Sequence, residues 1–304
     1  MNCPLCSTQR NITIRRYEIS DLRHDWIHTF SFDPFPKDLS IKSIHKKQCS
    51  SCKLIYFDPP YFGDGDFYST ISKNSWYYEE NKWEYDVAAE IASELSSTKL
   101  LEIGCGNGFF LDKVSSLGIQ TQGVDINKDA VAFCKKKGLQ VEATDVFDLT
   151  ASYDLVVSFE VLEHMDNPKR LFEFLVNKLI SPGGYLIIAV PNPSGYLNDM
   201  EMNLLDMPPH HNSSWSLATF EYLASHYGLQ LVSYKKEPLR YVHYLGMTQN
   251  MLRNYTKLVP NTLKVKLFLK IQSLIVRMLS PLTYLQDRER VDGQTHLVVL
   301  KNVR

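Results

Sequence analysis

The stretch Leu100-Leu-Glu-Ile-Gly-Cys-Gly-Asn-Gly-Phe109 decides the fold of this chain of 304 residues. An apolar strand, expected at 99–103, runs into glycines 104, 106 and 108, and a helix is expected at 108–117. Glycines at alternate positions let the backbone turn sharply and let a ligand approach it. The last glycine of a GxGxxG dinucleotide turn is replaced by Phe109, which disfavours a nicotinamide dehydrogenase. A turn without a ligand is the alternative interpretation.

Two carboxylates follow the next two expected strands. Asp125 ends the second strand and Asp145 follows the third. An acid about 20 residues after such a turn accepts hydrogen bonds from ribose hydroxyls in nucleotide-binding folds. An acid after the third strand can accept from the exocyclic amine of adenine. For both residues, helix capping or a solvated turn is the alternative.

Short apolar strands and helices alternate from residue 98 onward. This rhythm predicts right-handed crossovers and an open, doubly wound α/β sheet with both faces covered. Asn127 is a candidate N-cap, and Ser181-Pro-Gly-Gly184 is expected to end a helix. The expected strands are 99–103, 121–125, 139–143, 154–159, 185–190, 229–234 and 296–300, and the expected helices are 108–117, 127–137, 168–179, 217–227 and a helical region at about 246–285.

Five segments follow one another along the chain in this order: LEIGCGNGFFL, GVDI, ATDVFDL, YDLVVSFEVLEHM and SPGGYLIIAVPNP. They resemble the successive motifs of class I S-adenosylmethionine-dependent methyltransferases. The EVLEH segment is most similar to a subgroup with ubiquinone-biosynthesis O-methyltransferases and many sugar or antibiotic methyltransferases. The resemblance covers about 99–234. It implies a Rossmann-like sheet of seven strands, with an antiparallel last strand and a helical insertion at about 240–290 before it.

The same resemblance implies contacts to S-adenosylmethionine. Glu102 and the loop 104–108 would face its methionine part. Asp125 would hold the ribose, and Asp145 would meet the adenine. The complete set of expected cofactor-binding residues is Glu102, Gly104, Cys105, Gly106, Gly108, Asp125, Ile126, Asp145, Val146 and Phe159.

Methyl transfer from a sulfonium is an in-line displacement, so the protein mainly has to align donor and acceptor. A hydroxyl acceptor also benefits from a general base. The segment Pro208-Pro-His-His211 is favoured because it follows the fifth strand near Trp215, and a similar segment lies near the active site in the resembling enzymes. Loop or capping roles are the alternatives, and no magnesium constellation is evident. The expected catalytic residues are His210, His211, Glu160 and His164, with Glu163 as a further candidate base.

Four cysteines form two pairs, Cys3-Pro-Leu-Cys6 and Cys49-Ser-Ser-Cys52. Two such knuckles can supply four thiolates to a closed, structural zinc site. A bound zinc would replace the core that an irregular segment of about 60 residues lacks. The residue after each second cysteine is Ser7 or Lys53, where glycine is frequent. Chance cysteines or a redox pair are the alternatives.

The segment 49–60, CSSCKLIYFDPP, and the paired tyrosines after it resemble an N-terminal zinc-binding module of some bacterial methyltransferases. Those enzymes modify sugars, surface polysaccharides or secondary metabolites. We therefore expect a zinc-ribbon-like module at 1–66, a helical linker at 67–97 that contributes to the cofactor and substrate site, and the methyltransferase core at 98–304. Within the first two parts, 57–68 is expected to be a turn-rich connection and 76–95 a helix.

Composition limits the kinds of binding partner and the cellular location that we expect. A hydrophobic fraction of 44% and a net charge of −1 are typical of a soluble globular protein. The near-neutral charge and the lack of an aromatic-basic stripe argue against nucleic acid. We expect no secretory leader and no membrane span, so a cytoplasmic location is the default. The apolar segment 263–285 has three open interpretations: it covers the core, forms a homodimer surface, or lies on a membrane.

These observations favour methyl transfer to a small molecule, with a hydroxyl of a sugar, nucleotide-sugar or glycan precursor as the acceptor. One alternative is an RNA methyltransferase that grips its substrate with the zinc module. Another is a non-catalytic interaction protein that retains the fold. The intact glycine turn and Asp125 argue against loss of the cofactor.

Overall fold

A computed structural model describes residues 2–74, 77–95, 98–196, 203–245, 274–275 and 278–304. The chain divides into two compact units. The first consists of Met1–Val190, Leu204–Lys235 and Leu297–Arg304, and the second of Pro191–Asn203 and Lys236–His296. The candidate site described below lies within the first unit.

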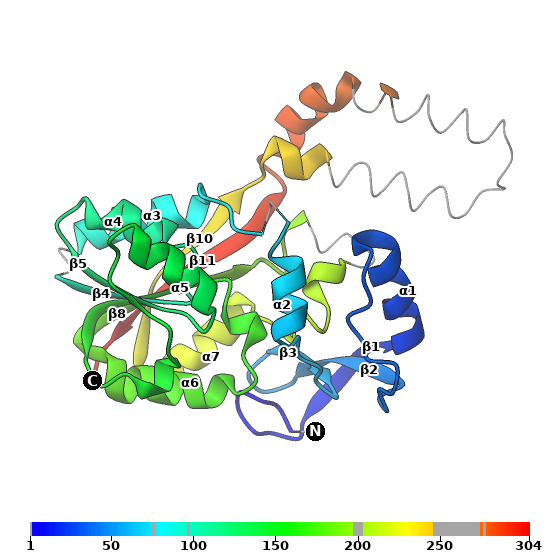
Figure 1. Cartoon of the computed structure of the whole chain (residues 1–304), viewed down its shortest axis with the longest axis horizontal. Coiled ribbons are helices and arrows are strands. Elements are labelled where there is room, and N and C mark those ends of the chain that lie inside the picture. Colours follow the sequence, from blue (N-terminus) through cyan, green and yellow to red (C-terminus); the bar gives the residue numbers. More distant parts are fainter. Residues whose placement is uncertain (1, 75–76, 96–97, 197–202, 246–273, 276–277) are drawn as a thin grey trace, which may run out of the picture. The chain divides into compact units, whose positions relative to one another are not determined.

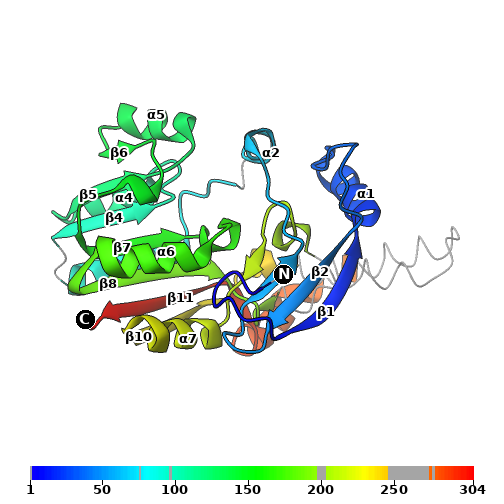
Figure 2. The same ribbon diagram turned by 90° about the horizontal axis from the view of Figure 1, so that it is seen from below.

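Seven strands of the described chain form one sheet, in the order β10-β11-β8-β7-β4-β5-β6, which Figure 2 shows edge to edge. The neighbours β6-β5, β5-β4, β4-β7 and β7-β8 are parallel. The strands are β4 (Lys99–Ile103), β5 (Gln120–Val124), β6 (Val141–Glu142), β7 (Tyr153–Phe159), β8 (Ile180–Pro191), β10 (Leu229–Pro238) and β11 (Asp292–Asn302).

Strand β11 runs antiparallel to β8. At one end, the amide nitrogen of Asn302 donates to the carbonyl of Ile180 over 3.3 Å. At the other end, the backbone N–H of Asn192 donates to the carbonyl of Gln294 over 2.7 Å. The start of one strand therefore meets the end of the other, as the resemblance implied.

Helices cover both faces of this sheet (Figure 1). One face carries α3 (Trp83–Glu94), α4 (Phe109–Ser115) and α5 (Lys128–Lys136), and the other carries α6 (Pro168–Phe174) and α7 (Leu217–Tyr227). Successive residues of a strand point to opposite faces. Accordingly, Leu155 and Val157 pack with α3 and α4, whereas Val156 packs with α6 and α7. The expected doubly wound fold is confirmed.

The boundaries of α5 and α6 can be compared with the expected ones. The side chain of Asn127 accepts hydrogen bonds from the backbone of Asp129 and Ala130, which confirms it as the N-cap of α5. Helix α6 continues as a π-helical turn, Leu175–Leu179, and ends one residue before Ser181-Pro-Gly-Gly184. That segment does end the helix, but it already belongs to β8 and is not a separate turn.

The expectation of an irregular N-terminal segment is wrong. Four strands form an antiparallel sheet in the order β1-β2-β3-β9 within the described residues. In β1, apolar residues alternate with polar ones only at Ile12 and Ile14, before Arg15-Arg16 interrupts the pattern, so the alternation is too short to predict a strand. The elements are β1 (Asn11–Glu18), α1 (Ile19–Phe30), β2 (Ser43–Cys49), β3 (Ile55–Asp58) and β9 (Ser213–Ser214).

Two further boundaries differ from expectation. The turn-rich segment 57–68 contains the end of β3 and the start of α2 (Gly65–Ile71), because the Asp64 carboxylate caps that helix by accepting from Phe67 N–H. The helix expected at 76–95 begins at Trp83, because Lys82 is extended; residue 76 lies outside the described residues.

Most of the apolar segment 263–285 lies outside the described residues, so its three interpretations stay predictions. No helix in the described part of the chain is long and apolar enough to cross a membrane. The large apolar side chains described in this segment are exposed: Leu274, Ile275, Met278, Leu279, Leu282 and Leu285.

Candidate active site

The turn after β4 requires its glycines. Gly104, Gly106 and Gly108 have φ angles of 74°, 47° and 72°, in the left-handed region that disfavours side chains. A Cβ atom on Gly104 would also collide with Cγ2 of Val161. A Cβ atom on Gly106 would lie 3.0 Å from the ring of Tyr78. The turn therefore brings bare backbone close to two neighbouring segments.

Asp125, directly after β5, holds this turn in place. One carboxylate oxygen accepts from the backbone N–H of Gly106 and the other from that of Asn127, both over 2.8 Å. Each oxygen keeps a lone pair for a ligand hydroxyl. The next residue, Ile126, is 80% exposed, and an aromatic base attached to a ribose at Asp125 would cover it. This arrangement suits a ribose with a purine beside it.

Asp145 has the capping role that was its alternative interpretation. Its carboxylate accepts from Phe147 N–H over 3.0 Å at the start of a 3₁₀ turn, Val146–Asp148. Asp145 is exposed and Val146 is buried. Capping uses one carboxylate oxygen, so contact with adenine stays a prediction for this pair.

Glu102 on β4 is a buried carboxylate. It is 2% exposed, and its Oε2 has no hydrogen-bond partner among the described residues. Burial, together with the charge of Asp125, raises the pKa of Glu102 well above its usual range. A cationic ligand group would relieve this cost. Cys105 is buried as well, and its pKa is raised mainly by that burial and further by the charges of Glu102 and Asp125.

Three imidazoles, from His164, His210 and His211, form one cluster. Their ring centroids lie 4.3–4.8 Å apart. His164 ends the 3₁₀ turn Leu162–His164 after β7, and the other two follow Pro208-Pro209. A backbone hydrogen bond joins the two segments, because Asn212 N–H donates to the carbonyl of Glu163 over 2.8 Å. All four predicted catalytic residues and Glu163 therefore belong to neighbouring segments.

Each imidazole is oriented through Nδ1. His164 Nδ1 lies 2.6 Å from the carbonyl of His210, and His210 Nδ1 lies 2.8 Å from the carbonyl of Leu205. A carbonyl only accepts, so both Nδ1 atoms carry the proton. His211 Nδ1 lies 3.2 Å from a carboxylate oxygen of Asp206 and donates to it. All three Nε2 atoms are left with their lone pairs.

Two glutamates approach these imidazoles. Glu163 is 1% exposed, and its Oε1 lies 3.9 Å from His164 Nε2 and 3.8 Å from His211 Nε2. Neither of its carboxylate oxygens accepts a hydrogen bond from an N–H group or a hydroxyl group within the described residues, and the neighbouring carboxyl of Glu160 can share a proton with it. Glu160, at the end of β7, has a φ of 54°, an uncommon conformation for a residue with a side chain. Such strain is frequent at functional sites.

Burial controls protonation in the cluster. Desolvation, with the neighbouring His211, lowers the pKa of His164 to about 3, and it lowers that of His210 well below its usual value. Both imidazoles are therefore neutral at pH 7. Burial and the charge of Glu163 raise the pKa of Glu160. Burial also raises the pKa of Glu163, and His211 opposes that shift.

Tyrosines that sequence reasoning did not name as site residues connect the cluster with the glycine turn. The hydroxyl of Tyr68, on α2, lies 3.1 Å from His164 Nδ1. The ring of Tyr77 lies 6.0 Å from that of His210. Tyr78 faces Gly106, and its hydroxyl accepts from the Asn127 amide over 3.3 Å. The paired tyrosines in the expected linker were the available signal.

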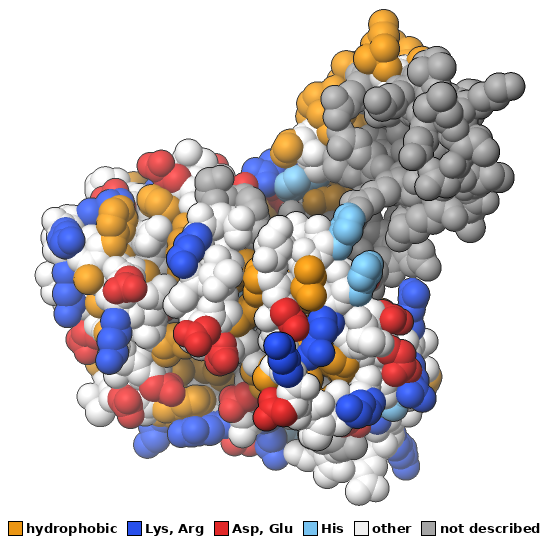
Figure 3. Space-filling view, turned by 45° about the vertical axis from the view of Figure 1, so that its right-hand side comes forward, with side chains coloured by type: hydrophobic (Ala, Val, Ile, Leu, Met, Phe, Trp, Pro, Cys, Tyr) orange, Lys and Arg blue, Asp and Glu red, His pale blue; other side chains and the backbone are white. Residues whose placement is uncertain are grey.

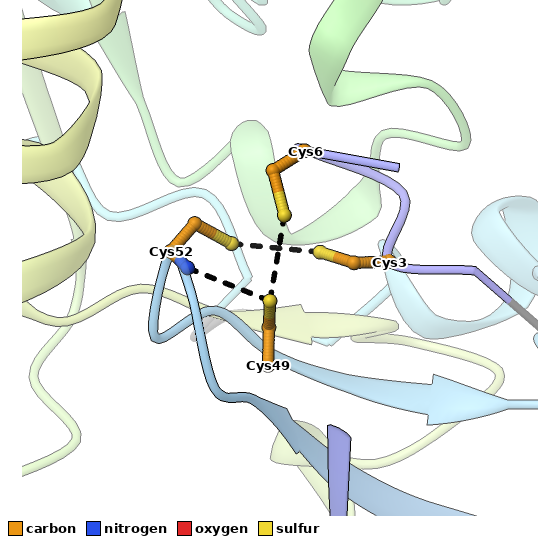
Figure 4. Close-up of side chains that lie close together, drawn as sticks. All are labelled: Cys3, Cys6, Cys49 and Cys52. Carbon is orange, nitrogen blue, oxygen red and sulfur yellow. Dashed lines mark hydrogen bonds between the residues drawn. The ribbon is translucent and has the colours of Figure 1, made fainter. Parts of the chain in front are cut away.

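The four N-terminal cysteines converge on one point (Figure 4). Their sulfur atoms all lie within 4.8 Å of one another, with Cys3 to Cys52 at 3.5 Å and Cys6 to Cys49 at 3.4 Å. Tetrahedral zinc with bonds of about 2.3 Å separates its sulfurs by about 3.8 Å. Ser7 and Lys53 have φ angles of 61° and 63°, the conformation that glycine adopts after a knuckle. The donor set fits zinc.

A family model described as "Methyltransferase domain" matches residues 75–234, a span that includes the glycine turn, Asp125 and the histidine cluster. The chain belongs to this methyltransferase family. Among curated proteins, it is similar to the ubiquinone biosynthesis O-methyltransferase of Burkholderia vietnamiensis, with 28% identity over 33% of this chain and 47% of the relative. The corresponding protein of Xanthomonas euvesicatoria is 30% identical over 33% of this chain and 45% of the relative. The chain thus spans about half the length of these relatives.

A solved structure supports the fold of this family member. The chain is similar to an S-adenosylmethionine-dependent methyltransferase from Archaeoglobus fulgidus, with a TM-score of 0.52 and 22% identity. The similarity covers 77% of this chain and 99% of the other. It confirms the Rossmann-like methyltransferase fold that the sequence predicted.

Proposed function

We propose that the chain transfers a methyl group from S-adenosylmethionine to a hydroxyl of a small molecule, in the class of sugars, nucleotide-sugars and glycan precursors. One observation carries this proposal. The Tyr77–Tyr78 pair lies against the Asp125-anchored glycine turn on one side and against the histidine cluster on the other. A methyl donor at the turn and an acceptor at the cluster would be neighbours.

The residues at the turn suit S-adenosylmethionine, which supplies an activated methyl group when bound. Asp125 would accept from the ribose hydroxyls with the lone pairs that its backbone contacts leave free. Exposed Ile126 would lie under the adenine. Glu102 would face the cationic methionine part, and its buried carboxylate oxygen would gain a partner.

The histidine cluster would position and ionise the acceptor. His211 is the residue on which we expect ionisation to depend. Asp206 holds its Nδ1–H, fixes the tautomer and stabilises positive charge on the ring, while Nε2 keeps a lone pair near Glu163. His164 and His210 would support its position, and Glu160 would border the cofactor and the acceptor.

Two similarities support this choice of acceptor. The curated relatives are named O-methyltransferases, which supports an oxygen atom as the acceptor. The N-terminal segment resembles modules of sugar-modifying enzymes, which supports the substrate class. RNA is disfavoured because acidic and basic side chains are interspersed on the face in Figure 3, without a broad basic patch on its described part. A cytoplasmic location accompanies this proposal, because the donor and nucleotide-sugars are available there.

We also propose that Cys3, Cys6, Cys49 and Cys52 bind one structural zinc ion. The fully buried Cys49 and Cys52 flank the turn between β2 and β3, so the ion would tie the N-terminal knuckle to that sheet. A closed site with four thiolates has no open position for substrate.

The test is methyl transfer from labelled S-adenosylmethionine to a panel of sugars, nucleotide-sugars and RNA. His211→Ala should lower turnover by about 10²–10³-fold and leave cofactor affinity within about twofold, because base catalysis contributes about that much. His226→Ala, an exposed histidine on α7, is the matched control and should keep full turnover. Transfer to RNA alone would replace the small-molecule proposal, and equal turnover in the His211 variant would remove that residue from its role.

A further inference from the structure

The histidine cluster has the organisation of a metal site. In metal centres, each ligating imidazole usually donates its second N–H to a carbonyl or carboxylate, which fixes the tautomer and aims the lone pair. Here the Nδ1 atoms of all three histidines have such acceptors, namely the carbonyls of His210 and Leu205 and the carboxylate of Asp206. This oriented triple was not visible in the sequence.

Ring nitrogens of the three histidines also lie close together. One ring nitrogen from each histidine lies within 4.8 Å of one from each of the other two. Glu163 Oε1 lies 3.8 Å and 3.9 Å from the Nε2 atoms of two of them. Metal–nitrogen and metal–oxygen bonds of about 2.0–2.2 Å place neighbouring ligands about 3–4 Å apart. Small side-chain movements would therefore close the site around one ion.

Buried atoms without partners give an independent indication. Within the described residues, His210 Nε2 is buried without a hydrogen bond, and neither oxygen of Glu163 accepts one from an N–H group or a hydroxyl group. Polar atoms in such a state are uncommon in folded proteins and are often explained by an ion or water. A cation at the centre of the cluster would satisfy the imidazole lone pair and the carboxylate together.

We propose that His164, His210, His211 and Glu163 bind a divalent first-row transition-metal ion. Three imidazoles and one carboxylate suit ions such as zinc, cobalt or iron, whereas magnesium and calcium prefer oxygen ligands. This site shares no residue with the four-cysteine site, which is built from thiolates.

A bound ion would add a catalytic group to the proposed methyl transfer. Its role in turnover rests on the proposed function, whereas its binding does not. A divalent ion lowers the pKa of a hydroxyl bound to it, so it would ionise the acceptor while the imidazole lone pairs hold the metal. His211 would then act through the ion. Binding of the ion itself requires neither S-adenosylmethionine nor an acceptor.

Cobalt(II) is the probe, added to the full chain after its cysteine site has been filled with zinc. Calorimetry and visible absorption should show one further equivalent of cobalt without thiolate charge-transfer bands. His210→Ala and His211→Ala should each weaken this binding at least about tenfold, because loss of an outer-shell partner alone costs 10–100-fold. Asp206→Asn should weaken it as well, although Asp206 is not a ligand.

The control is His28→Ala. His28 stacks on His24 along α1, and this exposed pair is the competing place for cobalt. The control should bind cobalt like the wild type. Circular dichroism and zinc content show whether each variant is folded. If a histidine variant does not fold, the cobalt affinity of the near-isosteric Glu163→Gln variant is measured in its place. No cobalt in the wild type, equal binding in the folded cluster variants, or loss in His28→Ala would overturn the proposal. Cofactor binding, measured separately, would survive any of these outcomes.

Discussion

Replacing Asp125 with alanine tests the cofactor site most directly. In the wild type, its two oxygens accept from Gly106 and Asn127 over 2.8 Å and keep lone pairs for the ribose hydroxyls. Alanine removes both the ribose acceptor and the connection between the turn and β5. We therefore expect weaker binding of S-adenosylmethionine, not an altered acceptor preference.

The magnitude follows from the lost hydrogen bonds. A hydrogen bond to a charged group contributes about 1.5–3 kcal/mol, and about 1.4 kcal/mol corresponds to a factor of ten in affinity. Loss of one net ribose contact would raise Kd about tenfold, and loss of both would raise it a hundredfold or more. Asp125→Asn keeps one oxygen acceptor without the charge and should fall between the wild type and Asp125→Ala.

Isothermal titration calorimetry with S-adenosylmethionine measures this change. Asp129→Ala is the matched control, because Asp129 is exposed in the first turn of α5, close to Asp125 in sequence. It should bind like the wild type. Thermal unfolding confirms that each variant is folded. A folded Asp125→Ala variant with Kd within twofold of the wild type would refute the ribose assignment.

Three further predictions address the zinc, the turn and the buried carboxylate. Metal analysis should find about one zinc per chain, and Cys49→Ser should lose it and lower the free energy of unfolding by about 3 kcal/mol or more; a folded, metal-free wild type would contradict this. Gly104→Ala should lower stability by about 2 kcal/mol and weaken cofactor binding, whereas Gly118→Ala, with a similar φ of 76° and open space around it, should cost about 1 kcal/mol and leave binding unchanged. Glu102→Gln should stabilise the chain by about 1 kcal/mol at pH 7 yet weaken cofactor binding. Folding raises the pKa of Glu102, so the protonated carboxyl costs little stability at a pH below its unfolded pKa of about 4.3. The stability gained by Glu102→Gln should therefore grow as the pH rises above about 4.3, which denaturant titrations measure. A gain independent of pH would contradict the assignment.

Patterns between near neighbours in the chain were readable without a structure. The strand and glycines at 99–108, the cap at Asn127 and the bounds of α7 depend on local spacing and backbone preference, and the structure confirms them. The N-terminal sheet was missed for a related reason. Strand β1 is mostly exposed and its apolar alternation covers only Ile12 and Ile14, so its stability depends on pairing with β2 more than on a local pattern.

Candidate residues could be named from the sequence, but their arrangement could not. Glu160 and His164 belong to one motif and His210 and His211 to another, and spacing said nothing about which nitrogen of each ring is free. Backbone carbonyls and Asp206 hold the Nδ1 atoms and so decide which ring nitrogens are free. The hydrogen bond between Asn212 and Glu163 brings the two motifs together. Residues this far apart meet because the carboxyl ends of parallel strands lie at one edge of the sheet, where the loops that follow them converge. Local sequence patterns thus indicated the methyltransferase family, whereas only long-range packing brought the imidazoles together as a candidate metal site.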